Sequence, residues 1–342
     1  MNNYIVSEIY KTDKKSIEQV DKLLAKEAIK RDKNSDYLAA IFDDNGKVIA
    51  TGSLYKNTLR SLAVDSNRQG ESIMNTLISH LMYEANSRGY FKLYLYSKAS
   101  STNIFKTLGF YEIARVDGVL SFMENKKNGF KNYLDGLNKS PKFYKKVAGL
   151  VINANPFTKG HLYLIEKASN ENDLVHLFII SDDSSFFPFE VRKNLVKEST
   201  SHLVNIIYQE TGDYIISSST FPSYFIKNEP DVIRAQARLD AEIFIKIAKN
   251  LGINKRYLGT EIPGSTTYVY NQILSDTLPK NGIEIDLVDR VEYEGKSISA
   301  SNVREFIKNG NIEATKPLLP NPTYNFINST EANPIIEKIK NQ

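Results

Sequence analysis

From residue 147 onward the sequence alternates between short apolar runs and amphipathic helical segments, and this alternation limits the fold more than any other feature. Five apolar runs can be recognised, at residues 147–153, 174–181, 204–208, 257–259 and 283–288. Each is followed by a segment with helical periodicity. Strands that alternate with helices in this way form a doubly wound parallel sheet, and ligands bind beyond the carboxyl ends of its strands.

The sequence before residue 125 is organised differently. Apolar runs at 37–42 and 48–54 flank Asp43-Asp44-Asn45-Gly46, which is typical of a hairpin turn because Asn and Gly tolerate positive φ. Strands and helices are mixed without strict alternation, so residues 1–124 are expected to form a mixed α/β domain. Residues 125–146 are rich in Lys, Asn and Gly and are expected to be a linker before a second domain at 147–342.

Composition agrees with two globular domains and excludes several classes of protein. The chain has 342 residues, 41% of them hydrophobic, which at roughly 150 residues per domain predicts about two domains. A net charge of +4 without a clustered basic face argues against a nucleic-acid partner. Cysteine is absent, which excludes disulfides, thiolate metal sites and a cysteine nucleophile. No apolar run suggests a membrane helix or a secretory signal, so a cytoplasmic protein is expected.

The loop after the first strand of the second domain carries the first candidate for chemistry. It reads Asn153-Ala154-Asn155-Pro156-Phe157-Thr158-Lys159-Gly160-His161. A strand, a tight turn and a helix N-terminus together offer backbone N–H groups to a phosphate. Gly160 allows close approach of a ligand, and His161 can donate to a phosphate oxygen as charge develops there. An ordinary strand–helix loop would explain this segment equally well.

The second candidate is Ile298-Ser299-Ala300-Ser301-Asn302-Val303-Arg304. Two hydroxyl groups precede a helix, and an arginine follows one turn later, a combination suited to phosphate oxygens. A serine N-cap beside a surface arginine is the alternative. The two segments occur in order on either side of the five-strand pattern, and this favours phosphate binding.

Together the two segments resemble the signatures of the H-x-G-H nucleotidyltransferase superfamily, with Thr158 in place of the first histidine. The N-x-N-P-F-T-x-G-H form of the loop is similar to that of the citrate lyase ligase family. Further matches to that family are Phe187-Pro188-Phe189 followed by Arg192, and Leu258-Gly259-Thr260-Glu261. The resemblance extends over essentially the whole chain and implies a Rossmann-like, doubly wound nucleotidyltransferase domain at residues 147–342.

This resemblance implies an ATP-dependent ligase that forms AMP. Acetate would attack the α-phosphate of ATP, and the acetyl group would pass to the thiol of the phosphoribosyl-dephospho-CoA group on the acyl carrier (gamma) subunit of citrate lyase. Mg²⁺ would arrive with the phosphates, and no metal site of the protein's own is expected. His161 and Thr158 would be catalytic. The nucleotide-binding set implied by the family is Asn153, Asn155, Pro156, Phe157, Thr158, Lys159, Gly160, His161, Gly259, Thr260, Glu261, Ile298, Ser299, Ser301 and Arg304.

The first domain resembles GNAT-type N-acetyltransferases through Asn67-Arg68-Gln69-Gly70-Glu71-Ser72 and Leu108-Gly109-Phe110. Such a loop binds the pyrophosphate of acetyl-CoA at a helix N-terminus. Phe105 stands where many members carry a tyrosine acid, so ordinary acetyl transfer is not expected. The resemblance instead implies a domain that binds a CoA-like group, and the residues expected to bind it are Arg68, Gln69, Gly70, Glu71 and Ser72.

Two other functions remain open at this point. A cofactor adenylyltransferase fused to an acetyltransferase would use the same phosphate site, although Thr158 argues against it. A non-enzymatic protein that senses CoA and nucleotides would also need both domains, although the complete set of phosphate-binding candidates argues against that.

Overall fold

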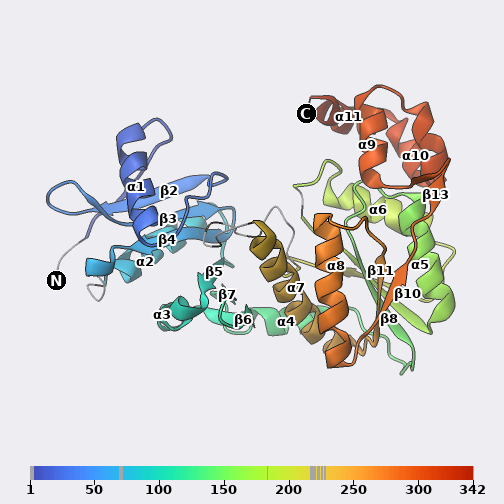
Figure 1. Cartoon of the computed structure of the whole chain (residues 1–342), viewed down its shortest axis with the longest axis horizontal. Helices are drawn as coiled ribbons and strands as arrows, with labels where there is room; N and C mark the ends of the chain where they lie inside the picture. Colours follow the sequence, from blue (N-terminus) through green and yellow to red (C-terminus); the bar gives the residue numbers. More distant parts are fainter. Residues whose placement is uncertain are drawn as a thin grey trace. The chain divides into compact units, whose positions relative to one another are not determined.

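The computed structural model describes residues 4–68, 72–182, 184–215, 221, 224, 226 and 229–341. The chain forms two compact units. One comprises residues 1–133 and 220–242, and the other comprises residues 134–219 and 243–342. Figure 1 colours the elements of both units by sequence. Within the described ranges, no helix is long and apolar enough to cross a membrane.

The first unit is built on a seven-stranded sheet, and the sheet is mixed, as the sequence predicted. Its strands are β1 (Val6–Glu8), β2 (Tyr37–Phe42), β3 (Val48–Tyr55), β4 (Thr58–Val64), β5 (Tyr94–Lys98), β6 (Tyr111–Val116) and β7 (Leu120–Glu124), in the order β1-β2-β3-β4-β5-β7-β6. Neighbouring strands are antiparallel except β4 and β5, which are parallel and pair only at Thr58–Tyr94 and Leu59–Leu95. The expected hairpin turn is present, with Gly46 at a φ of 72°. The hairpin between β6 and β7 was not predicted.

Two helices cover opposite faces of this sheet because side chains alternate along each strand. From β2, Leu38 and Ala40 pack with α1 (Lys14–Lys26), whereas Ala39 and Ile41 pack with α2 (Ile73–Ser87). A short helix, α3 (Thr102–Thr107), follows β5. The expected linker contains one helix, α4 (Gly129–Gly136).

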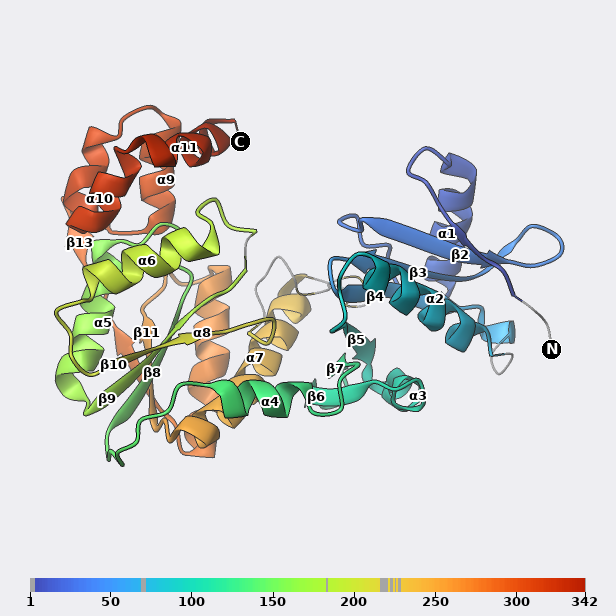
Figure 2. The same ribbon diagram turned by 180° about the vertical axis from the view of Figure 1, so that it is seen from behind.

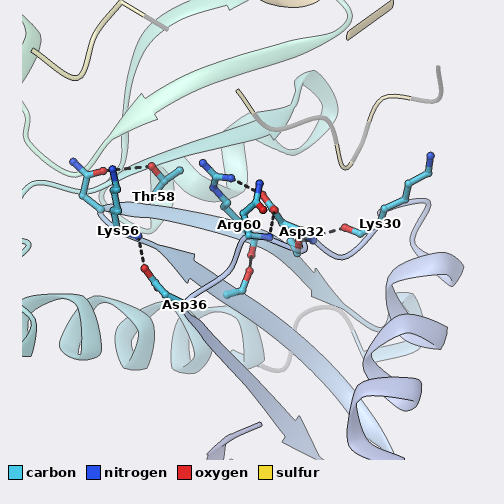
Figure 3. A network of polar contacts seen from close by, with 10 residues as sticks. Lys30, Asp32, Asp36, Lys56, Thr58 and Arg60 are labelled. Atoms are coloured by element: carbon cyan, nitrogen blue, oxygen red, sulfur yellow. Dashed lines mark hydrogen bonds and ion pairs between the residues drawn. The ribbon is translucent and has the colours of Figure 1, made fainter. Parts of the chain in front are cut away.

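A polar network lies along β4 of this unit. Figure 3 shows the buried Arg60 turned toward Asp32, whose carboxylate accepts a hydrogen bond from the guanidinium at 2.5 Å. The backbone N–H of Asp32 donates to the hydroxyl of Ser61 at 3.0 Å. The backbone N–H of Lys30 donates to the carbonyl oxygen of Tyr224 at 2.6 Å. Through this contact, residues 220–242, which the sequence analysis included in the second domain, are attached to the first unit.

The second unit contains a five-stranded parallel sheet, which confirms the doubly wound fold. Its strands are β8 (Val147–Ile152), β9 (Leu174–Ile179), β10 (Ile206–Glu210), β11 (Lys255–Gly259) and β12 (Glu284–Val288), in the order β10-β9-β8-β11-β12. The helices that follow these strands in sequence are α5 (Lys159–Glu171), α6 (Phe189–Ser199), α7 (Glu229–Leu251) and α8 (Thr266–Thr277). Residues 229–242 of α7 belong to the first unit, and residues 243–251 belong to the second. From β8 the chain adds β9 and then β10 on one side of the sheet. It then returns to add β11 and β12 on the other side of β8.

The reversal places helices on both faces of the sheet. Leu177 of β9 lies in one core with Ile165 of α5 and Val196 of α6. The adjacent Phe178 points to the other face and meets Phe244 of α7 edge-on, with ring centroids 6.4 Å apart. Figure 2 shows α5 and α8 on opposite sides of the strands.

The chain ends in a helical layer that the sequence analysis did not predict in full. It contains α9 (Ala300–Lys308), which was expected, and α10 (Asn321–Ile327) and α11 (Asn333–Lys340), which were not. Val303, Ile327 and Ile336 share a core with Phe187, which precedes α6. A short hairpin of β13 (Glu292–Tyr293) and β14 (Lys296–Ser297) leads into α9. This layer fixes the position of the second phosphate-binding candidate.

Candidate functional site

The candidate site lies where the strand order of the parallel sheet reverses, between β8 and β11. The loops after these two strands leave toward opposite faces, and in folds of this type ligands bind between two such loops at the carboxyl edge of the sheet. The loop after β8 contains the first predicted segment, and the loop after β11 contains Thr260 and Glu261. Most of the predicted nucleotide-binding residues are therefore at the edge where such folds bind ligands.

Thr158 and His161 form a reciprocal cap at the start of α5. The Thr158 hydroxyl accepts from the backbone N–H of His161 at 3.4 Å, and the backbone N–H of Thr158 donates to His161 Nδ1 at 3.1 Å. The hydroxyl also lies 2.8 Å from Nδ1. Since Nδ1 accepts a hydrogen bond from the backbone N–H, the proton of the neutral ring is on Nε2. Thr158, which was predicted to be a catalytic and nucleotide-binding residue, is buried, and its contacts hold the histidine in place.

The electrostatic surroundings keep His161 neutral. Burial, with a smaller contribution from the nearby positive charge of Arg290, lowers the pKa of His161 to about 4. The buried ring of Phe157 stacks on the imidazole, with centroids 5.6 Å apart and planes inclined by 19°. The result is a fixed, uncharged imidazole that can offer its Nε2–H to an anion.

Gly160 brings the two predicted segments together. A Cβ atom at this position would lie 3.1 Å from the carbonyl oxygen of Ile298, closer than side chains normally allow. The first turn of α5 therefore approaches the backbone that leads into α9. The absence of a side chain is required here by the approach of another segment, rather than by the backbone angles of the loop.

The second segment caps α9 and reaches back to the first. Ser299 is the N-cap, and its hydroxyl accepts from the backbone N–H of Asn302 at 3.1 Å. Arg304 donates to the carbonyl oxygen of Asn155 at 2.5 Å and to the Ser301 hydroxyl at 3.1 Å. Partial burial lowers the pKa of Arg304, but the guanidinium remains charged at neutral pH. The two segments, separated by about 140 residues in sequence, thus share one site.

Arg290 is a candidate that the sequence analysis missed. It follows β12, and its guanidinium pairs with Glu261 and donates to the carbonyl oxygen of Thr260 at 2.8 Å. Its charge also acts on His161. The only sequence signal was its position just after the fifth predicted strand. The strand order shows that this position lies beside the loop after β11.

Arg192 forms hydrogen bonds with the backbone of two loops at the candidate site. It is fully buried and donates to the carbonyl oxygens of Asn153, Ile180, Asp182 and Phe187 at 2.6–2.9 Å. These oxygens belong to the loops after β8 and β9. The sequence analysis noted Arg192 only as part of the family pattern, since nothing local indicates which carbonyl groups it meets.

The remaining predicted residues of this site have mixed surroundings. The side chains of Asn153 and Asn155 accept hydrogen bonds from Ser185 and from the backbone of Phe187, at 3.3 and 3.1 Å. Pro156 follows a cis peptide bond, and Lys159 is exposed. The carbonyl oxygen of Gly259 accepts from Asn271 at 2.8 Å.

In the first unit, the predicted CoA-binding loop is described only in part. Arg68 ends a short 3₁₀ turn, and Ser72 is the N-cap of α2 with a φ of 60°. Gln69, Gly70 and Glu71 lie outside the described residues. Phe105 is buried in the core beneath α2, as a packing residue would be.

The fold and the paired loops define the class of protein: a GNAT fold followed by a Rossmann-like domain of the nucleotidyltransferase type. Comparison with known proteins agrees. Residues 4–110 match the acetyltransferase (GNAT) family, and residues 147–327 match the citrate lyase ligase C-terminal domain. The chain belongs to the citrate lyase ligase family.

Individual relatives extend this similarity over nearly the whole chain. The chain is 31% identical to the [citrate [pro-3S]-lyase] ligase of Escherichia coli K12, over 95% of its own length and 94% of that protein. It is 30% identical to the ligase of the same name from Klebsiella pneumoniae, over 92% of its own length and 93% of that protein. A shorter match, 43% identical over 54 residues, covers 15% of this chain and 33% of the phosphopantetheine adenylyltransferase of Streptococcus sanguinis.

Proposed function

We propose that the protein activates citrate lyase by acetylating the thiol of the phosphoribosyl-dephospho-CoA group on its acyl carrier subunit, at the expense of ATP. The observation that carries this proposal is the close approach of the two phosphate-binding candidates. Gly160 of the first segment meets the backbone of Ile298, so His161 and Arg304 belong to one site. The names of the relatives supply the identity of the enzyme that is activated.

In the first half-reaction, an acetate oxygen forms a bond to the α-phosphorus of ATP. The bond from that phosphorus to the α,β-bridging oxygen breaks, and pyrophosphate leaves with its electron pair. His161 donates its Nε2–H to a non-bridging α-phosphate oxygen, on which negative charge builds in the transition state. Its neutral form at pH 7 leaves this proton available without adding a charge that would bind the ground state equally well.

The leaving pyrophosphate needs positive charge and donors. Arg304, together with the hydroxyls of Ser299 and Ser301, is suited to the β- and γ-phosphates. Arg290 lies near enough to His161 to influence its pKa and adds charge at the same edge of the sheet. Mg²⁺ that accompanies ATP neutralises the remaining phosphate charge.

In the second half-reaction, the carrier thiol attacks the carbonyl carbon of acetyl-adenylate. A thioester forms, AMP leaves, and the thiol proton passes to solvent. Both nucleophiles, acetate and the thiol, come from substrates. The protein itself therefore needs no cysteine, in agreement with its composition.

The decisive test is acetate-dependent exchange of labelled pyrophosphate into ATP, because it reports the first half-reaction without the carrier. We expect exchange with acetate and none without it. In His161→Ala the exchange rate should fall about 10²–10³-fold, the usual effect of losing one transition-state donor. Circular dichroism and the unfolding midpoint serve as controls for folding. Near-normal exchange in a folded His161→Ala protein would contradict the role given to this residue.

A cofactor adenylyltransferase is the second candidate, and the short match to phosphopantetheine adenylyltransferase favours it specifically. That activity would transfer the adenylyl group to a phosphate acceptor and would form no AMP in the presence of acetate. Product analysis with acetate and carrier separates the two. AMP that requires both substrates supports the ligase, whereas an adenylylated phosphopantetheine product supports the transferase.

A further inference from the structure

A cavity of about 680 Å³ lies in the first unit. Its walls come from the end of β5, the turn between β6 and β7, and the first part of α7, all within residues 1–133 and 220–242. None of the described residues at the amino end of α2 lines it. The volume is in the range of sites that hold a whole small-molecule ligand.

The α7 side of this cavity is positively charged. Arg234 and Arg238 are one helical turn apart, so their side chains lie on the same face of α7. Both are exposed, and within the described part of the chain neither forms an ion pair. Lys98 at the end of β5 adds a third positive charge, and one ammonium hydrogen is held by the carbonyl oxygen of Glu27 at 2.9 Å. Among the described residues of the lining, Asp231 is the single carboxylate.

The other walls carry little charge. Val116, Gly118 and Val119 from the β6–β7 turn and Ala99 after β5 supply small and apolar surface. The backbone N–H of Ala99 donates to the carbonyl oxygen of Val119 at 3.2 Å, which ties these walls together. A ligand that fits such a cavity has an anionic end that meets the arginines and a slim neutral part that lies along the turn.

We propose that this cavity binds the phosphate groups and the adjoining pantetheine arm of a CoA-type molecule, with Arg234, Arg238 and Lys98 as the phosphate-binding residues. Guanidinium groups bind phosphate oxygens in a bidentate manner, and two of them on one helix face suit a pyrophosphate. The choice of ligand rests on the proposed function, in which the carrier presents such a group. The residues of the cavity are distinct from the loop at residues 68–72.

Calorimetric titration of the full chain with dephospho-CoA tests this proposal. The Arg234→Ala/Arg238→Ala double variant should bind dephospho-CoA at least tenfold more weakly than the parent protein. Pantetheine without phosphate should bind weakly to both proteins and show no difference between them. Lys249→Ala, an exposed change on the same helix outside the cavity, is the matched control and should bind like the parent.

Acetate-dependent pyrophosphate exchange is measured in parallel and should be the same in the double variant and the parent. If the parent lacks exchange but the double variant still loses dephospho-CoA binding, the proposed reaction fails and the cavity assignment holds. Equal binding of dephospho-CoA by parent and double variant overturns the proposal. So does the absence of any binding by the parent at millimolar concentration.

Discussion

At the scale of single residues, His161 owes its properties to Thr158 as much as to its own chemistry. The sequence suggests that threonine in place of the usual first histidine removes a donor to phosphate. In the structure the hydroxyl of Thr158 lies 2.8 Å from His161 Nδ1, and the backbone N–H of Thr158 donates to the same atom. The substitution therefore changes a ligand-facing position into one that sets the orientation and tautomer of the remaining histidine.

Thr158→Val tests this positioning role, because valine keeps the shape and removes the hydroxyl. We expect the rate constant of pyrophosphate exchange to fall about tenfold, while the KM for ATP changes little. Loss of the helix cap should also lower the free energy of unfolding by about 1 kcal/mol. Thr158→Ser restores the hydroxyl and should restore most of the rate. Equal rates in the Val and Ser variants would show that the hydroxyl does not act on His161.

Gly160→Ala tests whether the approach of the two segments matters. The added methyl group would lie 3.1 Å from the carbonyl oxygen of Ile298, so the start of α9 must move. Overpacking of this kind destabilises proteins by about 1–3 kcal/mol, and we expect weaker ATP binding in addition. Gly136→Ala is the control, since its Cβ would have no neighbour within 4 Å. Unchanged ATP affinity in Gly160→Ala would mean that the approach is not needed for the nucleotide.

At the scale of elements, the site depends on loops that are held together from the inside. Arg192 projects from α6 to the carbonyl oxygens of the loops after β8 and β9. Because a guanidinium carries five N–H donors in a planar fork, one side chain satisfies several buried acceptors at once. The strands determine where these loops start, and Arg192 determines how they are arranged beyond the sheet.

Arg192→Met keeps an unbranched, flexible side chain but leaves the carbonyl groups of the loops after β8 and β9 without their donor. Each buried acceptor that loses its partner costs about 1–3 kcal/mol, so we expect the unfolding free energy to fall by about 3 kcal/mol or more. Urea unfolding followed by circular dichroism measures this. Arg115→Met, at an exposed arginine, should change stability by less than about 0.5 kcal/mol. A similar small effect at Arg192 would rule out its role as an organiser of the loops.

At the scale of the whole molecule, residues 220–242 belong to the first compact unit although they follow three strands of the second. Two contacts attach this segment to the first unit. The backbone N–H of Lys30 donates to the carbonyl oxygen of Tyr224, and the rings of Phe221 and Tyr96 meet with centroids 5.7 Å apart. Deleting residues 1–124 would therefore expose surface on residues 220–242 and disturb folding. The role of the first unit is better tested by substitutions in the full chain.

The stability of the whole protein should depend on pH through His161 and His176. Burial lowers the pKa of His176, and of His161, to about 4 in the folded state. The ordinary pKa of histidine in an unfolded chain is about 6.5, so between these values the unfolded state binds more protons. The unfolding free energy should therefore fall as the pH is lowered from about 6.5 to 4.5. Urea unfolding across this range measures the slope, and His176→Gln should make it shallower. An equal slope in that variant would contradict the prediction.

Much of the fold could be predicted because it is encoded locally. The apolar runs and helical periodicities indicate which residues turn inward, and the order of strands and helices then allows few arrangements besides a doubly wound sheet. The cap of α5 is local too, since Thr158 and His161 are three residues apart. For the same reason, the family and most of the candidate nucleotide residues could be named from short segments.

The tertiary structure alone decided which distant side chains meet. Arg290 pairs with Glu261 because β11 and β12 are neighbours, and Arg304 reaches Asn155 because α9 returns to the edge where β8 ends. Residues 220–242 join the first unit through contacts that no local pattern specifies. Periodicity records whether a residue is buried, but the identity of its partner depends on strand order and on the path of the chain between strands.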